Sequence, residues 1–349
     1  MSLGTSARDT INSIKGLVSV IVPVYRVKEY VAECVQSLLN QTYPHIELIF
    51  IDDAGKDGSI ELVELLLKGT DISYSIIRQP ENKGVSVARN MGVQAAKGEF
   101  ILFVDSDDFI SEHCIEKLIN KATADHADIV FGSFVYIKNG QVEPSHWCYS
   151  DSDVATDAPL ISYVQQKTVI MPWSRLMRRD FYINSGVRFM EGIRYEDEPW
   201  SFSLILRAKR ISFVKDVIYY YRIWDGAFMS GTELDEFRIN SMYQHLVNCS
   251  QESYRFDIWN FNYFRTWYAR SIFFFCSKVI HSKMTNALKI LYLDKVYSEL
   301  RLPYKELNDI FLYPMAKKMS FILPKYRWLK MLVLLKEIKN RVCRRLQTS

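Results

Sequence analysis

The sequence of 349 residues lacks the features that mark membrane-spanning and secreted proteins. It holds no run of about 18 apolar residues, so no transmembrane helix is expected. Residues 1–16 are largely polar, and the apolar run at 17–24 is too short to be the core of a signal peptide followed by a cleavage site. These absences predict a cytoplasmic protein.

Paired cysteines and glycine-rich nucleotide motifs are also missing. The six cysteines show neither close pairing nor metal-ligand spacing, which indicates reduced thiols in a cytosolic protein. No G-x-G-x-x-G segment follows a predicted strand, and this disfavours a nicotinamide-binding Rossmann domain. The chain has no internal repeat and no low-complexity segment. Its length is enough for two domains.

Positive charge is concentrated at the C-terminus. The formal net charge is +4, but residues 325–349 carry eight Lys or Arg and one Glu, so the rest of the chain is mildly acidic. An acidic body argues against nucleic-acid binding. Within residues 325–346, apolar side chains at near-helical spacing alternate with basic ones, which predicts a basic amphipathic helix. Such a helix lies on an anionic membrane surface, here the inner face of the cell membrane, or packs on protein.

Strands and helices alternate through the first 134 residues. Apolar and β-branched runs predict strands at 17–24 (ending near Pro23), 47–53, 74–78, 100–104 and 129–134. Helical spacing predicts helices at 29–40, 62–67, 86–96 (capped by Ser86) and 112–124. This alternation predicts an α/β fold with a doubly wound, mainly parallel sheet flanked by helices. Two further strands are predicted at 211–214 and 217–222, and an aromatic-rich helical region follows residue 233.

Three carboxylates follow the predicted strand at 100–104: Asp105, Asp107 and Asp108. Open α/β sheets bind their ligands at the carboxyl ends of the strands. Because closely spaced carboxylates repel one another, a cation is favoured there, and Asp105 and Asp107 can both reach one Mg²⁺ or Mn²⁺. The alternative is a solvated turn with helix-capping acids, an interpretation that suits Asp108.

Several segments together carry a resemblance to a known family. They are Pro23-Val-Tyr25, Asp52-Asp53, Glu81-Asn-Lys-Gly-Val-Ser-Val-Ala-Arg-Asn90, Asp105-Ser-Asp-Asp108, Trp173-Ser-Arg-Leu176 and Tyr195-Glu-Asp-Glu-Pro-Trp200. In this combination the chain resembles a family-2 glycosyltransferase with the nucleotide-sugar-binding GT-A fold. The resemblance is close over residues 17–135, extends to about residue 230, and gives no residue-level guidance after residue 235.

The resemblance implies a domain organisation and a reaction. A GT-A catalytic domain would span 17–232, with a nucleotide-binding half at 17–134 and an acceptor half at 135–232. An N-terminal extension (1–16) would precede it, and a helical region (233–349) would follow. The enzyme would be a metal-dependent, inverting hexosyl- or N-acetylhexosaminyltransferase. Its donor would be a nucleotide-sugar, with UDP-sugars favoured, and its acceptor a glycan or lipid-linked hydroxyl in bacterial capsule, lipopolysaccharide or other polysaccharide synthesis.

The resemblance also implies roles for individual residues. The donor-binding positions correspond here to Pro23, Val24, Tyr25, Asp53, Lys83, Gly84, Arg89, Asp105 and Ser106. Asp107, with Asp105, would hold a Mg²⁺ or Mn²⁺ that bridges the diphosphate. Asp197 would be the general base that takes a proton from the acceptor hydroxyl, and Glu196 and Glu198 are the fallbacks for this role.

Alternatives to these roles stay open. Asp53 could cap a turn, and Arg89 could form a surface ion pair. Asn82, Lys83 and Gly84 could form a plain turn, and residues 196–198 could be a solvated helix N-terminus. Trp173 and Trp200 could be core residues. The family often has Asn at position 26 and usually Ser at position 55. The Arg26 and Gly55 found here leave the donor base open. A nucleotidyltransferase is disfavoured because the loop at 23–26 has no glycine. A non-catalytic accessory or scaffold subunit remains the second hypothesis, and the oligomeric state is open.

Overall fold

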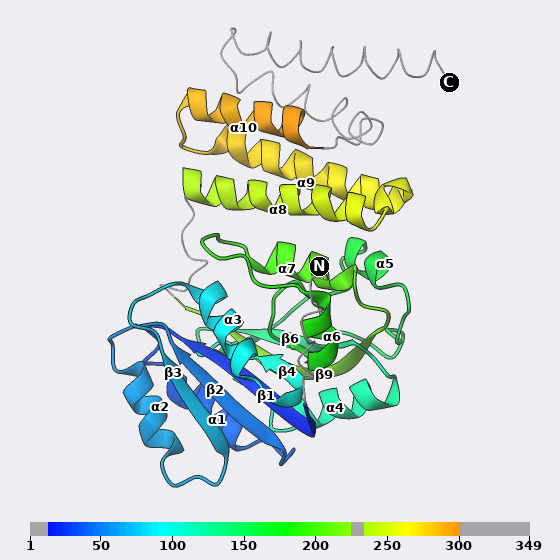
Figure 1. Cartoon of the computed structure of the whole chain (residues 1–349). Coiled ribbons are helices and arrows are strands. Elements are labelled where there is room, and N and C mark those ends of the chain that lie inside the picture. The colour runs from blue at the N-terminus through cyan, green and yellow to red at the C-terminus, as the bar shows by residue number, and fades with distance from the viewer. Residues whose placement is uncertain (1–12, 225–233, 301–349) are drawn as a thin grey trace, which may run out of the picture. The chain divides into compact units, whose positions relative to one another are not determined.

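The computed structural model describes residues 13–224 and 234–300 (Figure 1). The chain forms two compact units that divide between Gly231 and Thr232. The first unit is α/β, and the described part of the second, residues 234–300, is helical. The predicted fold class is therefore confirmed, and so is the helical C-terminal region over these residues. The amphipathic helix predicted at 325–346 lies outside the described residues. Within the described part, no helix is long and apolar enough to cross a membrane.

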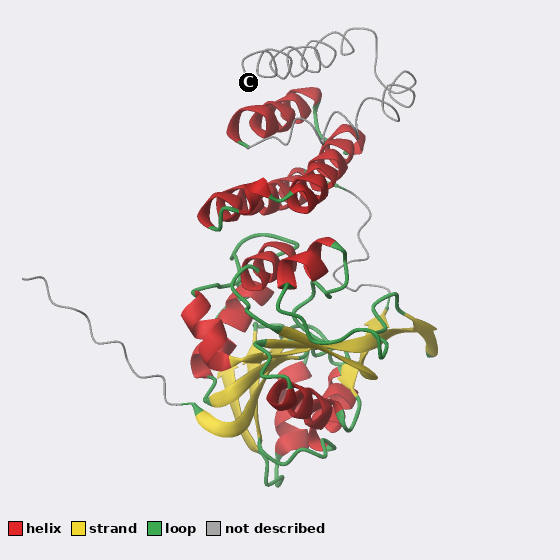
Figure 2. Cartoon of the chain, turned by 90° about the vertical axis from the view of Figure 1, so that its right-hand side faces the viewer, coloured by secondary structure: helices red, strands yellow, loops and turns green. Residues whose placement is uncertain are grey.

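A single mixed sheet forms the centre of the first unit. Its strands follow the order β3-β2-β1-β4-β8-β6-β9-β5, and β7 pairs with β6. The strand bounds are β1 Ile14–Val24, β2 Ile46–Asp52, β3 Ser73–Arg78, β4 Gly98–Phe103, β5 Phe109–Ile110, β6 Ile129–Lys138, β7 Gln141–Pro144, β8 Arg175–Arg178 and β9 Ile211–Ile223. Figure 2 shows helices against both faces of this sheet.

The first four strands in this order are all parallel, as the doubly wound prediction requires. Their cores are apolar on both faces, and in β1 the side chains of Val18, Val20 and Ile21 are fully buried. The crossover helices are α1 Val31–Leu39, α2 Ser59–Leu67 and α3 Val85–Ala95. Because the strands joined by these helices are parallel, the carboxyl ends of β1, β2, β3 and β4 lie at one edge of the sheet.

Glycines shape the start and the packing of α3. The helix begins after Gly84, which has a φ of +89°, while Ser86 is buried within the first turn. The predicted Ser86 cap is therefore wrong: Gly84 adopts a left-handed conformation that Ser avoids. Further along, a Cβ on Gly92 would come within 2.2 Å of Ile21 Cγ2. The missing side chain lets α3 lie directly on β1.

The second half of the sheet departs from the parallel pattern. Strand β8 runs antiparallel between β4 and β6, and β5 runs antiparallel to β9. The two strands predicted at 211–214 and 217–222 are one strand, β9, whose pairing with β6 shifts register around Ser133. A β-bulge of this kind interrupts the apolar pattern without ending the strand. The remaining helices of this unit are α4 Cys114–Ala124, α5 Pro159–Val164, α6 Arg179–Ser185 and α7 Asp197–Ile205.

The second unit contains α8 Glu236–Arg255, the 3₁₀ turn Ile258–Asn260, α9 Asn262–His281 and α10 Asn286–Glu299. Aromatic side chains join these three α-helices. The rings of Tyr243, Phe275 and Tyr292, one from each helix, have centroids 6.0 to 6.4 Å apart. Asp235 caps α8 by accepting a hydrogen bond from the Arg238 amide at 2.8 Å. Among the described aromatic residues after position 250, Phe264, Tyr268, Phe275 and Tyr292 are buried in the core, whereas Tyr254, Phe261, Tyr263 and Phe274 are exposed.

Candidate active site

The turn after β4 carries Asp105, Asp107 and Asp108, and we call it the acidic turn. The side chain of Asp108 holds this turn in place. This side chain is fully buried, and its oxygens accept hydrogen bonds from the Tyr219 hydroxyl and the Arg222 amide, each at 2.7 Å. The same hydroxyl accepts from the Asp105 amide at 3.1 Å. Burial, reinforced by the charges of Asp107 and Asp105, raises the pKa of Asp108 well above its usual range. The interpretation of Asp108 as a solvated helix cap is therefore wrong. Its position fixes the turn to β9.

The two carboxylates proposed as metal ligands have different partners. Asp105 Oδ1 accepts from the Arg89 guanidinium at 2.9 Å, while Asp107 Oδ2 accepts from the indole of Trp224 at 3.0 Å. Burial, together with the charge of Asp105, raises the pKa of Asp107. A nearby cation would reverse this effect, because it favours the ionised carboxylate.

The residues at this turn fit a hard divalent ion. Within residues 13–224 and 234–300, no group of three or more His, Cys, Asp or Glu side chains forms a metal cluster. Mg²⁺ in nucleotide enzymes is commonly held by only one or two carboxylates, and substrate phosphates and water complete its shell. Asp105 and Asp107 provide this smaller set.

Arg89 connects the acidic turn to α7. Its side chain is only 5% exposed, and it donates to Asp105 Oδ1 and to Glu196 Oε1 at 2.9 Å each. Although burial alone would lower the pKa of Arg89, the charges of Asp105 and Glu196 outweigh it and raise the pKa above its usual range. The guanidinium also lies 5.3 Å from the ring of Phe189. The surface ion pair considered for Arg89 is therefore wrong.

Asp197 begins α7, directly after Glu196, and is half-buried. Burial, reinforced by the charge of Glu196 and opposed by Arg89, raises the pKa of Asp197 to about 7. The helix behind it is rigidly packed. Trp200 is 1% exposed, stacks on Phe189 with centroids 4.4 Å apart, and donates to the Tyr182 hydroxyl at 3.1 Å. Trp200 is thus a core residue, and so is the buried Trp173.

Asp53 organises the loop before α3. Its two oxygens accept four hydrogen bonds, from Gln79 Nε2 at 2.8 Å, Asn82 Nδ2 at 3.0 Å, the Lys83 amide at 2.7 Å and the Gly84 amide at 3.0 Å. A carboxylate offers about four acceptor sites, so this set occupies them all. The contacts of Asp53 thus match the turn-capping alternative, and a donor would have to displace one of these partners to reach it.

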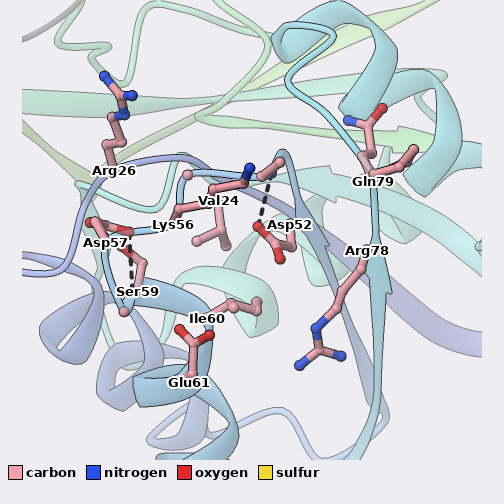
Figure 3. Close-up of a pocket in the computed structure, with 14 residues that line it drawn as sticks. Val24, Arg26, Asp52, Lys56, Asp57, Ser59, Ile60, Glu61, Arg78 and Gln79 are labelled. Atoms are coloured by element: carbon pink, nitrogen blue, oxygen red, sulfur yellow. Dashed lines mark hydrogen bonds between the residues drawn. The ribbon is translucent and has the colours of Figure 1, made fainter.

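A cavity of about 160 Å³ lies beside this loop, at the carboxyl ends of β1, β2 and β3 (Figure 3). Its lining includes Val24 and Asp52 from the strand ends and the basic side chains of Arg26, Lys56 and Arg78. Pockets that enclose a whole drug-sized ligand measure roughly 300–1,000 Å³. The cavity can therefore take one part of a larger ligand, such as a nucleobase.

The other predicted donor residues lie around this edge. Tyr25 is exposed and lies under the guanidinium of Arg26, whose carbon is 5.1 Å from the ring centroid. Buried Ser106 donates to the Pro23 carbonyl at 2.6 Å and so ties the end of β4 to that of β1. The Lys83 ammonium is 3.9 Å from Glu81.

The sequence interpretation missed Tyr219, Arg222, Trp224 and Gln79. Each lies near the end of a strand or directly after it, β3 for Gln79 and β9 for the other three. That position at the sheet edge was the available signal, but β9 was not predicted to reach the acidic turn.

Comparisons with known proteins agree with this architecture. Residues 19–186 match the family described as glycosyl transferase family 2. The glycosyltransferase GlyG of Streptococcus pneumoniae is 32% identical over 230 residues, which are 63% of this chain and 74% of GlyG. The poly(ribitol-phosphate) beta-glucosyltransferase of Bacillus spizizenii is 31% identical over 218 residues, which are 61% of this chain but only 33% of that protein.

A solved structure shows the same fold. Residues 1–349 of Staphylococcus aureus TarS, in complex with UDP-GlcNAc, align with a TM-score of 0.58 and 20% identity, over 92% of this chain and 80% of that one. The predicted GT-A architecture is thereby confirmed. Because residues 19–186 match this family and because GlyG is 32% identical over 74% of its own length, the chain belongs to glycosyl transferase family 2.

Proposed function

We propose that this glycosyltransferase transfers a hexosyl or N-acetylhexosaminyl group from a UDP-sugar, with inversion, to a hydroxyl of a cell-surface glycan or lipid-linked polymer, assisted by Mg²⁺ or Mn²⁺. The observation that carries the proposal is the Arg89 bridge. One buried guanidinium binds both Asp105 on the acidic turn and Glu196 next to Asp197. The residues proposed to bind the leaving group and the residue proposed as the base therefore belong to one site.

The donor side uses the sheet edge. We assign the nucleobase and ribose to the cavity bounded by Val24 and to the neighbouring Pro23 and Tyr25. The loop at 79–84, held by Asp53, forms one side of this region. The diphosphate would then lie toward Asp105 and Asp107. When bound there, a divalent ion would offset the negative charge that develops on the leaving diphosphate.

The base side uses α7. We assign proton abstraction to Asp197 and not to Glu196, because the Glu196 carboxylate is buried and forms an ion pair with Arg89. A pKa near 7 suits a general base at neutral pH, since the group is both available and basic. A single base that acts on the face opposite the leaving group gives one displacement at the anomeric carbon, and therefore inversion.

We infer the chemical class of the donor and of the acceptor from what similar proteins are named for or were solved with. TarS was solved with UDP-GlcNAc, and one relative is named for glucosyl transfer to poly(ribitol-phosphate). These names support a UDP-sugar donor and a polymeric cell-surface acceptor for this chain. A lipid-linked acceptor would also suit peripheral binding to the inner membrane face through residues 325–346.

The experiment compares three variants for sugar transfer and for UDP-sugar hydrolysis with Mn²⁺. Asp197→Asn should lose transfer by at least about 100-fold, the lower range for losing a general base. Asp107→Asn should also lose transfer, because it removes a ligand of the divalent ion that offsets charge on the leaving diphosphate. Asp151→Asn is the matched control, because its carboxylate is 84% exposed and pairs only with Lys215 among the described contacts. Full activity in either active-site variant would refute its assigned role. Nucleotide-sugar binding by the wild type without any turnover would favour the non-catalytic subunit.

A further inference from the structure

Trp224 contacts a carboxylate of the proposed metal site with a neutral donor. Its indole Nε1–H donates to Asp107 Oδ2 at 3.0 Å. This group can only donate, and it carries no charge. It therefore fixes the orientation of the carboxylate without adding a positive charge that would repel a cation. Asp105 differs in this respect, because its partner is the guanidinium of Arg89.

A stack of side chains holds the indole in place. The ring of Trp224 lies on that of Tyr30, with centroids 4.8 Å apart, and Tyr30 stands directly before α1. The guanidinium of Arg222 also lies on the Tyr30 ring, with its carbon 5.0 Å from the ring centroid. Arg222 pairs with Glu33 and donates to the backbone carbonyl of Asp107 at 2.8 Å. The Asp107 carbonyl and carboxylate are thus both held by residues that follow one another closely in the chain.

The sheet sets the register of this contact. Strand β9 carries Arg222 and is followed at once by Trp224, and residues two apart in an extended chain point to the same side. The pairs Phe109–Tyr220 and Ile110–Tyr219 join β9 to β5, directly after the acidic turn. A shift of β9 by one residue would turn both side chains away from Asp107.

We propose that Trp224 is a positioning residue for the divalent ion, acting through its hydrogen bond to Asp107. The inference rests on the metal role in the proposed function. The indole takes one acceptor site of the carboxylate and leaves the others for a hard cation. Groups that hydrogen-bond to a metal-ligating carboxylate typically contribute 10–100-fold to metal affinity.

The test measures Mn²⁺ affinity in the presence of UDP. Electron paramagnetic resonance counts free Mn²⁺, and a protein-free Mn²⁺–UDP sample is the blank. Trp224→Phe removes the N–H and keeps an aromatic ring on Tyr30. It should weaken Mn²⁺ binding about 10–100-fold, while UDP affinity without metal stays unchanged. Trp147→Phe is the matched control, because its indole donates to the Gln166 carbonyl at 3.2 Å, away from Asp107.

The outcomes separate this inference from the proposed function. If the wild type binds Mn²⁺ with UDP and Asp107→Asn does not, but Trp224→Phe binds like the wild type, the role of Trp224 is overturned and the metal role survives. If the wild type binds no Mn²⁺ beyond the blank, both are overturned. If Trp224→Phe fails to fold, the test uses NMR of the wild type instead and follows the indole ¹⁵N–H signals of its tryptophans. One signal should broaden with substoichiometric Mn²⁺ and UDP while that of Trp147 does not, and the absence of any broadening would overturn the inference.

Discussion

Replacing Asp197 by Asn should stabilise the protein at alkaline pH, although it removes the group that we propose as the general base. The pKa of Asp197 is raised from 3.8 to about 7, mainly by burial. Its protonated form therefore contributes stability that is complete below pH 4 and is lost as the pH rises through 7. Three pKa units correspond to up to about 4 kcal/mol at 1.36 kcal/mol each. Asn has no charge to lose, so Asp197→Asn should not show this loss.

The assay is urea unfolding of the full chain at pH 4 and at pH 8, followed by tryptophan fluorescence. The quantity of interest is the free energy of unfolding of Asp197→Asn minus that of the wild type. This difference should be larger at pH 8 than at pH 4 by up to about 4 kcal/mol. Asp151→Asn, at an exposed site, should show almost no such change. A difference that is independent of pH, or larger at pH 4, would refute the burial argument for Asp197.

Three further predictions follow from the contacts of the site. Arg89→Met should lower the free energy of unfolding by about 3 kcal/mol, because it leaves two carboxylates without their shared cation; a loss below about 1 kcal/mol in urea unfolding would contradict the bridge. Asp53→Ala should speed hydrogen exchange at the Lys83 and Gly84 amides, with a loss of about 2–3 kcal/mol in stability; unchanged exchange would show that another group holds the loop. The transfer rate should rise with pH through about 7 as Asp197 ionises, and a rate that is flat from pH 5.5 to 8 would exclude it as the base.

Most strands of the sheet could be predicted from the sequence because their signals are local. Strands β1, β2 and β4 contain apolar runs at 20–24, 48–51 and 100–103, and the side chains of these runs are largely buried, as in strands covered on both faces. The antiparallel β8 was not predictable in the same way. It is only four residues long, Arg175–Arg178, and its position depends on pairing with β4 and β6.

The candidate site was predictable in its residue types but not in its contacts. Arg89 and Glu196 are 107 positions apart, and Asp107 and Trp224 are 117 apart. No local pattern encodes such pairs, since they depend on how α3, α7 and β9 converge. The burial of Asp108 was missed for the same reason, because the Tyr219 hydroxyl that satisfies it comes from β9.

The proposed function requires that this chain bind a nucleotide-sugar through a divalent ion at Asp107. The most direct measurement is thermal unfolding with Mn²⁺ and a panel of UDP-, GDP-, CMP- and dTDP-sugars. A ligand that binds only the native state raises the midpoint, with about 2.7 kcal/mol of stabilisation at 100 times its dissociation constant. We expect a rise with the UDP-sugars that disappears without metal and in Asp107→Ala. No rise with any donor in folded protein, or an equal rise in Asp107→Ala, would contradict it.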